Sequence, residues 1–253
     1  MQNISVRDEE AKQIRKAFIP SKGNVLVSTD YSQIELRVLA ALSNENKMIK
    51  AFNDGKDIHA QTAIDVFKLK ADKVDANKRR QAKAVNFGVV YGISSFGLSN
   101  QTGLPIDEAK EFINNYFETY PNVKEYLDSQ VAFCQKNGYV KTILNRRKYI
   151  DEIKSNNFQL KEFGKRSAMN APIQGSAADL IKIGMINITK RIKEEKLKAK
   201  LILQVHDELI FDVPEKELDK VKKLIDEVMP NTYKLKTNLT YSFDTGDNWL
   251  EVK

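Results

Sequence analysis

The segment LILQVHDELIFDV, residues 201–213, places a polar triplet between two apolar runs. The runs are typical of β-strands, and His206-Asp207-Glu208 occupies the position of a tight turn, where Gly, Asn, Pro or Ser are usual. Another acidic residue, Asp30, follows the apolar strand core Val25–Val27. Taken singly, these features also fit plainer roles, a solvated acidic turn and a turn or helix-cap residue.

A hairpin turn can place Asp207 and Glu208 beside the end of another strand, and the strand that leads to Asp30 is the one that would bring carboxylates together. Clustered carboxylates repel one another, and protonation or a bound cation relieves this cost. Oxygen ligands in a chain with two histidines and one cysteine favour Mg²⁺ over zinc. Two such ions about 3.5–4 Å apart stabilise the attacking and leaving oxygens of a phosphoryl displacement.

The segment NKRRQAKAVNFGVVYGIS, residues 77–94, spaces Arg79, Lys83, Phe87 and Tyr91 four residues apart. On a helix, this spacing gives one slowly drifting stripe with two cations followed by two aromatic rings. A triphosphate along the stripe would meet the cations first, and its sugar and base would lie near Phe87. The alternative is a solvated basic face that runs into aromatic side chains of the core.

The surrounding sequence predicts strands near both ends of the chain and a helical block between them. The apolar spacing after Asp30 predicts a helix that starts at a capping box formed by Ser32 and Glu35. Residues 45–165 read as helices broken by turn signals, and a long helix is expected over about 165–196. The hairpin, an amphipathic helix over 215–230 and a tail strand follow. This order predicts an α+β fold, one sheet-based domain with a helical excursion.

The composition sets limits on the class of protein. The chain has 253 residues, a net charge of +7 and an isoelectric point near 9.2, which is compatible with a polyanionic partner without requiring one. Cys134 is the single cysteine, which excludes an intrachain disulfide and a cysteine-based zinc site. The polar start does not resemble a signal peptide, and no apolar run approaches the ~20 residues that span a bilayer. A reducing, cytoplasmic compartment and no membrane partner are therefore expected.

Four segments in this order resemble the polymerase domain of the family A DNA polymerases, the bacterial DNA polymerase I family. They are DYSQIELR at 30–37, RRQAKAVNFGVVYG at 79–92, RSAMNAPIQGSAADLIK at 166–182 and QVHDE at 204–208. The resemblance covers essentially the whole chain. It implies an antiparallel-sheet palm formed from residues 1–59 and 166–253, with mainly helical fingers over residues 60–165. Thumb and exonuclease domains are absent from the resemblance.

The resemblance implies a two-metal site in the palm. By analogy with the family, Asp30 and Asp207 bind two Mg²⁺ ions, and the backbone carbonyl of Tyr31 is a further ligand. Glu208 is implied as an auxiliary catalytic carboxylate. Because adjacent strand residues face opposite ways, we expect Asp207 to be the ligand and Glu208 a supporting neighbour.

The resemblance also assigns the nucleotide contacts. Arg79 and Lys83 would hold the triphosphate, and Lys83 could protonate the pyrophosphate leaving group. Phe87 would pack on the incoming sugar and base, and Tyr91 would stack near the templating base. Glu35 would crowd the sugar 2′ position and exclude ribonucleotides, beside its capping role. Gln33 is included among the nucleotide-binding residues.

The implied partners are primer–template DNA and deoxynucleoside triphosphates. Five residues are expected to contact the DNA: His206 beside the primer terminus, Arg166, Asn170 and Gln174 on its minor-groove side, and Arg37. The implied function is template-directed primer extension by a cytoplasmic, nucleoid-associated enzyme of bacterial or phage origin, with an organelle as the alternative location. Two alternatives remain: a truncated, non-catalytic DNA-binding module, and one half of a split enzyme that needs a thumb-bearing partner chain.

Overall fold

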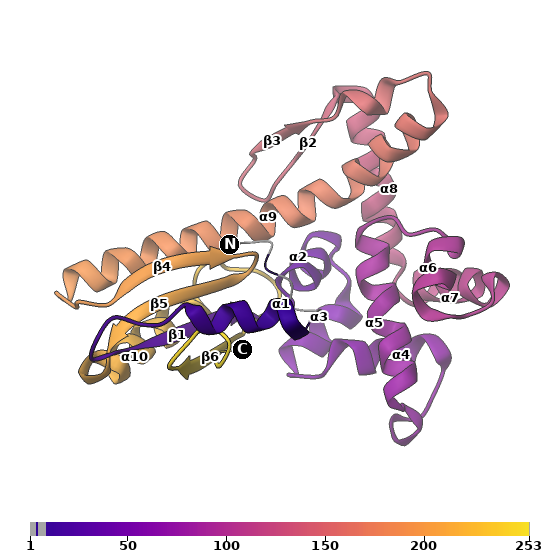
Figure 1. Ribbon diagram of the computed structural model, residues 1–253. Helices are drawn as coiled ribbons and strands as arrows, with labels where there is room; N and C mark the ends of the chain where they lie inside the picture. Colours follow the sequence, from indigo (N-terminus) through magenta and orange to yellow (C-terminus); the bar gives the residue numbers. More distant parts are fainter. Residues whose placement is uncertain (1–3, 5–8, 253) are drawn as a thin grey trace. The chain divides into compact units, whose positions relative to one another are not determined.

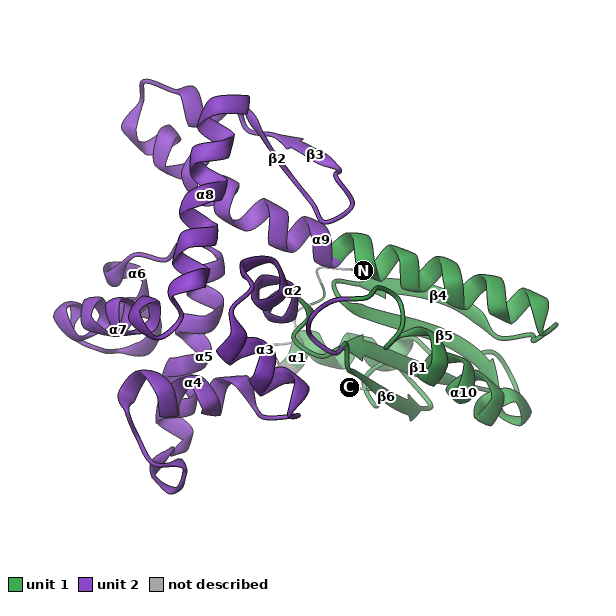
Figure 2. Cartoon of the chain, turned by 180° about the vertical axis from the view of Figure 1, so that it is seen from behind, with its two compact units in different colours: residues 1–34, 178–234, 239–253 green, residues 35–177, 235–238 purple. Residues whose placement is uncertain are grey.

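The computed structural model describes residue 4 and residues 9–252, and it divides the chain into two compact units (Figure 1, Figure 2). The first unit comprises residues 1–34, 178–234 and 239–253, coloured green in Figure 2. The second comprises residues 35–177 and 235–238, coloured purple. The chain therefore leaves the first unit, builds the second and returns, as the predicted helical excursion requires.

The first unit is built on a four-stranded antiparallel sheet with the strand order β4-β5-β1-β6. The two inner strands come from opposite ends of the chain, which confirms the predicted antiparallel sheet from both chain ends. The tail strand and the hairpin of the opening motif are also confirmed. The bounds are Asn24–Tyr31 for β1, Lys200–Val205 for β4, Glu208–Pro214 for β5 and Tyr241–Gly246 for β6.

One face of this sheet is covered by the N-terminal segment and the C-terminal tail. Leu26 of β1 and Ile210 of β5 pack with Trp249 in a buried apolar cluster. Phe18 meets the Trp249 ring edge-on with the ring centroids 5.3 Å apart, and the Arg15 guanidinium lies 4.2 Å above that ring. Residues before Phe18 form the helix α1, Glu9–Gln13, and the short 3₁₀ segment η1, Ile14–Ala17.

The opposite face of the sheet carries Thr29 and Tyr31, since alternate strand residues share a face. Thr29 Oγ1 contacts the sulfur of Met229, which lies just after the helix α10, Leu218–Val228. The short 3₁₀ segment η4, Glu215–Glu217, precedes α10, and together they confirm the predicted amphipathic helix. The last part of the long helix α9, Phe158–Glu194, also belongs to this unit.

The second unit is mainly helical, as predicted for the middle of the chain. No described helix of either unit is long and apolar enough to cross a bilayer. The elements of the second unit are α2 Ile34–Ser43, α3 Asn46–Asn53, α4 Ile58–Phe67, η2 Ala71–Lys73, α5 Ala76–Val90, α6 Ser95–Thr102, α7 Ile106–Thr119, α8 Pro121–Asn137, β2 Tyr139–Lys141, β3 Arg147–Tyr149, η3 Asp151–Lys154 and the first part of α9.

Three local expectations need correction. The small β2–β3 ribbon, paired from Tyr139–Tyr149 to Lys141–Arg147, was missed because its strands have three residues each and no apolar alternation. The helix α9 begins at Phe158 rather than near residue 165. Gln33, with a φ of 55°, separates Ser32 from the first helical residue, so Ser32 does not hold the N-cap position that the capping box requires.

The predicted palm and fingers boundaries, at residues 59/60 and 165/166, both fall inside the second compact unit. The division into palm and fingers describes functional regions, whereas the two units describe compactness. The division of the chain into a palm and fingers therefore stays a prediction.

Candidate functional site

The carboxylates Asp30 and Glu208 lie directly opposite each other on the paired strands β1 and β5. Directly opposed residues of an antiparallel pair share one face of the sheet, so both side chains lie on the same side. Ser28 lies on that face too, and its Oγ donates a 2.8 Å hydrogen bond to Oε1 of Glu208, which is only 2 % exposed. Glu208 is therefore the direct cross-strand neighbour of Asp30. The sequence had suggested only that Glu208 is a neighbour of Asp207 that supports the site.

His206 and Asp207 form a two-residue turn between β4 and β5, closed by the pair Val205 and Glu208. His206 has a φ of 55°, and hairpin positions with positive φ favour Gly because a Cβ makes them strained. Gln204 Nε2 donates a 3.1 Å hydrogen bond to the carbonyl oxygen of His206. The predicted tight turn is thus confirmed, and its exposed His206 occupies a backbone conformation that local preference alone does not explain.

Tyr31 fixes the end of β1 beneath the acidic residues. Its side chain is 1 % exposed, and its hydroxyl lies 2.6 Å from Thr232 Oγ1 and donates to the carbonyl oxygen of Met229 at 3.2 Å. Burial raises the pKa of Tyr31 to about 12, although the Thr232 hydrogen bond acts in the opposite sense. Gly184 of α9 leaves room for this hydroxyl, since a Cβ there would lie 2.9 Å from it. The backbone beside Asp30 is therefore held rigidly.

The oxygen donors at this end of the sheet suit Mg²⁺ in their chemistry, since they comprise Asp30, Asp207, Glu208 and the carbonyl of Tyr31. Within the described residues, no three Asp, Glu, His or Cys side chains form a ready-made metal cage. Mg²⁺ is usually held by one or two carboxylates together with substrate phosphates and water. The donor set therefore fits Mg²⁺ that is shared with a phosphate-bearing substrate.

The cation–aromatic stripe lies on α5 and its C-terminal end, as predicted. Asp75 caps the helix, and its side chain accepts a 2.7 Å hydrogen bond from the backbone N–H of Lys78. Arg79 and Lys83 are exposed on α5, and Phe87 is half-buried one turn further along. The two cations, one and two turns into α5, are thus open to solvent, where an anionic ligand could reach them.

Arg79 is oriented by an acidic residue from the neighbouring helix. Its Nη2 lies 2.7 Å and its Nε 2.8 Å from Oδ2 of Asp57. Asp57 is also the N-cap of α4 and accepts hydrogen bonds from the backbone N–H groups of His59 and Ala60. Burial alone would raise the pKa of Asp57, but these backbone bonds and Arg79 outweigh it and lower the pKa. Asp57 therefore stays ionised and holds Arg79 in place.

His59 is a member of this group that the sequence analysis missed. Its side chain is 2 % exposed, its ring centroid lies 5.6 Å from that of Phe87, and its Nδ1 lies 3.1 Å from Nδ2 of Asn86. Burial lowers the pKa of His59 to about 4, Asp57 acts against this, and Arg79 and Lys83 add to it. The signal available in the sequence was its rarity, since the chain has only two histidines.

A cavity of about 430 Å³ lies at the C-terminal end of α5, lined by Phe87, Tyr91 and Arg166 among others. The Tyr91 hydroxyl donates a 3.0 Å hydrogen bond to Oε2 of Glu35. Gly92 has a φ of 64°, and a Cβ there would approach Cγ of Arg166 to 2.9 Å. The structure thus brings three of the predicted nucleotide and DNA contacts together in the second unit, with Glu35 bonded to one of them.

The three predicted minor-groove contacts, Arg166, Asn170 and Gln174, are spaced four residues apart on α9. They therefore form one stripe on that helix. Arg166 and Gln174 are exposed, and Asn170 is half-buried. Within the described part of the chain, Nδ2 of Asn170 is a buried atom without a hydrogen-bond partner.

Arg37 and Gln33 lie in surroundings that the sequence did not indicate. Arg37 is 8 % exposed, its guanidinium lies 4.5 Å above the Phe52 ring, and its Nη1 donates to the carbonyl oxygen of Asn238 at 2.5 Å. Burial lowers the pKa of Arg37 to about 10. Its burial gives the predicted DNA contact no support. Gln33 adopts a left-handed conformation in the link from β1 to α2.

The predicted site residues are divided between the two units. Asp30, Tyr31, Gln33 and the triplet 206–208 belong to the first unit. The second unit contains Glu35, Arg37, Arg79, Lys83, Phe87, Tyr91, Arg166, Asn170 and Gln174. Each group has a defined geometry within its own unit.

Comparison with known proteins identifies the family to which this chain belongs. The family description "DNA polymerase family A" matches residues 1–251. The chain is 51 % identical over 253 residues to DNA polymerase I of Caldicellulosiruptor bescii and 49 % identical over 254 residues to that of Bacillus subtilis. All of this chain is covered in both cases, but only 30 % and 29 % of the relatives. The chain therefore spans about a third of the length of the curated relatives it matches.

A solved structure agrees with these relatives. The POL domain of Pol1 from M. smegmatis, in complex with DNA primer-template and dNTP, matches with a TM-score of 0.94 and 42 % sequence identity. The match covers 99 % of this chain and 44 % of that chain. The family match over nearly the full length, the relatives and the shared fold lead to one conclusion: this chain belongs to the family A DNA polymerases.

Proposed function

We propose that this chain carries the catalytic part of a template-directed DNA polymerase, which adds deoxynucleoside triphosphates to a primer 3′ end and releases pyrophosphate. The observation that carries the proposal is the pairing of Asp30 with Glu208, next to Asp207 in a strained two-residue turn. The solved structure of similar fold holds DNA primer-template and dNTP, which supports the same substrates here.

In this proposal Asp30, Asp207 and the carbonyl of Tyr31 hold two Mg²⁺ ions, in a family that generally uses divalent metals. When bound, such ions supply positive charge to the attacking and leaving oxygens of the transfer. The chain's contribution is rigidity, because the buried Tyr31 hydroxyl and the Ser28–Glu208 hydrogen bond fix the strands that bear the ligands. Glu208 supports the site as a buried neighbour of Asp30.

The residues of α5 bind the nucleotide in this proposal. Arg79 and Lys83 attract the triphosphate, and Asp57 keeps the Arg79 guanidinium in one orientation. Lys83 Nζ gives a proton to the departing pyrophosphate, which lowers the charge that develops on it. Phe87, backed by the buried His59 ring, packs on the sugar and base.

Glu35 and Tyr91 select the sugar and the base pair. The hydrogen bond between them occupies the Glu35 carboxylate in this structure, so nucleotide binding would exchange one arrangement for another. Glu35 then excludes a 2′-hydroxyl, and Tyr91 stacks near the templating base. Gln33, which lies between Asp30 and Glu35 in the chain, also contacts the nucleotide in this proposal.

Arg166, Asn170 and Gln174 contact the duplex from its minor groove, and His206 lies beside the primer terminus. Minor-groove acceptors are similar for every correct base pair, so contacts there check shape rather than sequence. We further propose that a thumb-bearing partner chain supplies additional phosphate contacts and so contributes DNA affinity. The relatives are bacterial, which supports the proposal that this chain acts on the DNA of the nucleoid.

The test is primer extension with Mg²⁺, comparing the parent with Asp207→Ala. Loss of a charged ligand is expected to lower the rate at least about 100-fold, as when one transition-state contact is removed from an enzyme. Asp219→Ala, which removes an exposed carboxylate at the start of α10, is the matched control and should retain parental activity.

The outcomes separate the alternatives. Equal activity of the parent and Asp207→Ala would contradict the assignment of the site. DNA binding without any extension, even at low salt and high protein concentration, would favour a non-catalytic binding module. Extension that appears only after a thumb-bearing chain is added would support the split enzyme.

A further inference from the structure

Two adjoining cavities form a groove on the first unit, away from Asp30. The larger measures about 730 Å³ and the smaller about 470 Å³, and both are lined by Thr189, Lys193 and Leu201. The larger one lies where β1 and β4 begin and β5 ends, whereas Asp30 and Asp207 lie at the other ends of these strands. Six residues of strand separate the two places by roughly 20 Å.

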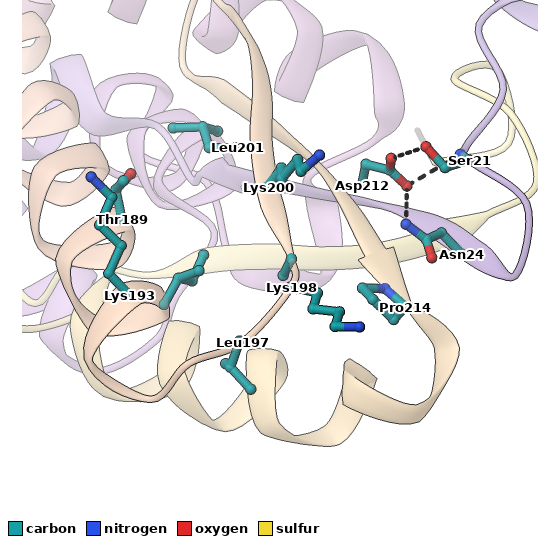
Figure 3. A pocket seen from close by; sticks show the side chains of 12 residues that line it. Ser21, Asn24, Thr189, Lys193, Leu197, Lys198, Lys200, Leu201, Asp212 and Pro214 are labelled. Atoms are coloured by element: carbon teal, nitrogen blue, oxygen red, sulfur yellow. Dashed lines mark hydrogen bonds between the residues drawn. The ribbon is translucent and has the colours of Figure 1, made fainter.

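The larger cavity is positively charged. Lys193 of α9 and Lys198 and Lys200, at the entry to β4, line it and are exposed (Figure 3). Within the described part of the chain none of these three lysines forms an ion pair. Asp212 is the one acidic residue of the lining, and its oxygens accept hydrogen bonds from the Ser21 hydroxyl at 2.6 Å and from Asn24 Nδ2 at 2.8 Å. The lining therefore presents three cations against one carboxylate that is already hydrogen-bonded.

The groove also presents apolar surface. Leu197 and Leu201 line the larger cavity, and Met185, Ile186 and Leu201 line the smaller one. Ile186 is 66 % exposed, so the smaller cavity offers aliphatic surface to a ligand. From Met185 to Lys193 the helix α9 borders the groove over eight residues, or about 12 Å along its axis, and Leu197 lies in the loop that follows the helix.

The shape and lining of the groove favour one class of occupant. A nucleic acid backbone would use the lysines, but it offers nothing apolar for Ile186, Met185 and Leu201 to contact. A small anion would leave most of a groove about 12 Å long, as estimated from the helical rise, in water. An amphipathic helix with acidic residues along the edges of its apolar face matches the length, the charge and the apolar lining.

We propose that this groove between α9 and β4, bordered by Lys193, Lys198, Lys200 and Ile186, docks an acidic amphipathic helix of a partner protein. The apolar face of that helix covers Ile186 and Leu201, and its carboxylates meet the three lysines. The interface lies at the far end of the sheet from Asp30, so a partner could be tethered to this chain while the acidic turn stays open. This inference does not depend on the proposed polymerase activity.

The test uses a fluorescein-labelled peptide of about 14 residues with alternating pairs of Glu and Leu, which is long enough as a helix to span the groove. Fluorescence anisotropy compares the full chain with the triple variant Lys193→Glu, Lys198→Glu, Lys200→Glu. Reversal of the groove charge should weaken binding at least about tenfold, and Ile186→Ser alone about fivefold. The matched control is Lys216→Glu, Lys220→Glu, Lys223→Glu, which makes the same charge change on η4 and α10 of the same unit and should alter binding less than about twofold.

Each other result overturns the proposal. Equal weakening by both triple variants would show general charge attraction, and undiminished binding of a Ser-for-Leu peptide would show that the apolar lining has no part. Tighter binding of a 14-nucleotide oligothymidylate, lost in the groove triple alone, would assign the groove to nucleic acid. Self-association in sedimentation, lost in the same variant, would assign it to a second copy of the chain. No peptide binding up to about 1 mM would exclude the site.

Discussion

At the scale of single residues, His59 is defined by its surroundings rather than by its position in a motif. It is almost completely buried, hydrogen-bonded to Asn86, and packed against Phe87. Burial is the largest cause of its lowered pKa, and the nearby cations Arg79 and Lys83 act in the same direction. The imidazole is therefore neutral at neutral pH and adds no positive charge to that of Arg79 and Lys83.

This neutrality predicts a pH dependence of stability. The pKa of His59 is 6.5 when unperturbed and about 4 in the folded chain, so the unfolded chain binds more protons between these values. The free energy of unfolding should therefore fall as the pH falls from about 6.5 towards 4, by on the order of 2–3 kcal/mol in all. Urea unfolding at pH 7 and pH 5 measures the free energy of unfolding of the parent and of His59→Gln. Between these pH values the parent should lose more stability than the variant.

The control for this prediction is the other histidine. His206→Gln removes the other imidazole, which lies in an exposed turn, and its stability is measured at the same two pH values for comparison. If the stability of His59→Gln falls with pH in parallel with that of the parent, protonation of His59 is not the cause.

At the scale of secondary structure, the register between β1 and β5 decides which acidic residues meet. A slip of one residue would turn every side chain of a strand to the other face of the sheet. The register is held from both sides, because Leu26 and Ile210 pack on one face while Thr29 and Tyr31 are anchored on the other. The strand pair therefore positions Asp30 opposite Glu208 through packing that lies outside the site.

The contact between Gly184 of α9 and Tyr31 of β1 gives a prediction about this anchoring. Gly184→Ala places a Cβ 2.9 Å from the Tyr31 hydroxyl and 3.4 Å from Thr232 Oγ1. The crowding should lower the free energy of unfolding by about 1–3 kcal/mol. It should also reduce primer extension, because the displaced Tyr31 lies beside Asp30.

A double-mutant cycle checks the cause. Tyr31→Phe removes the oxygen that the new methyl group would meet, so Gly184→Ala should cost less in that background than in the parent. Chemical unfolding of the four proteins provides the comparison. Additive effects would mean that the glycine is needed for another reason.

At the scale of the whole molecule, the chain distributes its chemistry over two compact units. The acidic turn and β1 lie in the unit built from both chain ends, and the cations of α5 lie in the inserted unit. The net charge of +7 gives the molecule a general attraction for polyanions, which adds to the specific contacts. Contacts to DNA should therefore have a strong electrostatic component.

This predicts a steep salt dependence of DNA binding. If three phosphates are neutralised, a rise from 50 to 200 mM salt should weaken binding about 40-fold, because each neutralised phosphate contributes about 0.9 to the slope. Fluorescence anisotropy of a labelled primer–template measures this. Arg166→Gln should weaken binding, and Lys223→Gln on α10 should not. Binding that does not respond to salt would contradict this expectation.

The sequence by itself determined the fold class and the family, and it supplied the candidate site residues. These follow from local information: the strand and helix periodicities, the spacing of Arg79, Lys83, Phe87 and Tyr91, and short motifs around Asp30 and Asp207. Periodicity reports neighbours a few residues apart, so it found the α5 stripe and the tight turn at His206. It missed the β2–β3 ribbon, where the local pattern is weak.

Only the tertiary structure decided which distant residues meet. It placed Glu208 opposite Asp30, brought His59 against Phe87, and buried Arg37 over Phe52. It also gathered Lys193, Lys198 and Lys200 around one groove. The physical reason is that strand register, burial and the exclusion of water depend on packing between segments far apart in the chain, and no local pattern of residues encodes these contacts.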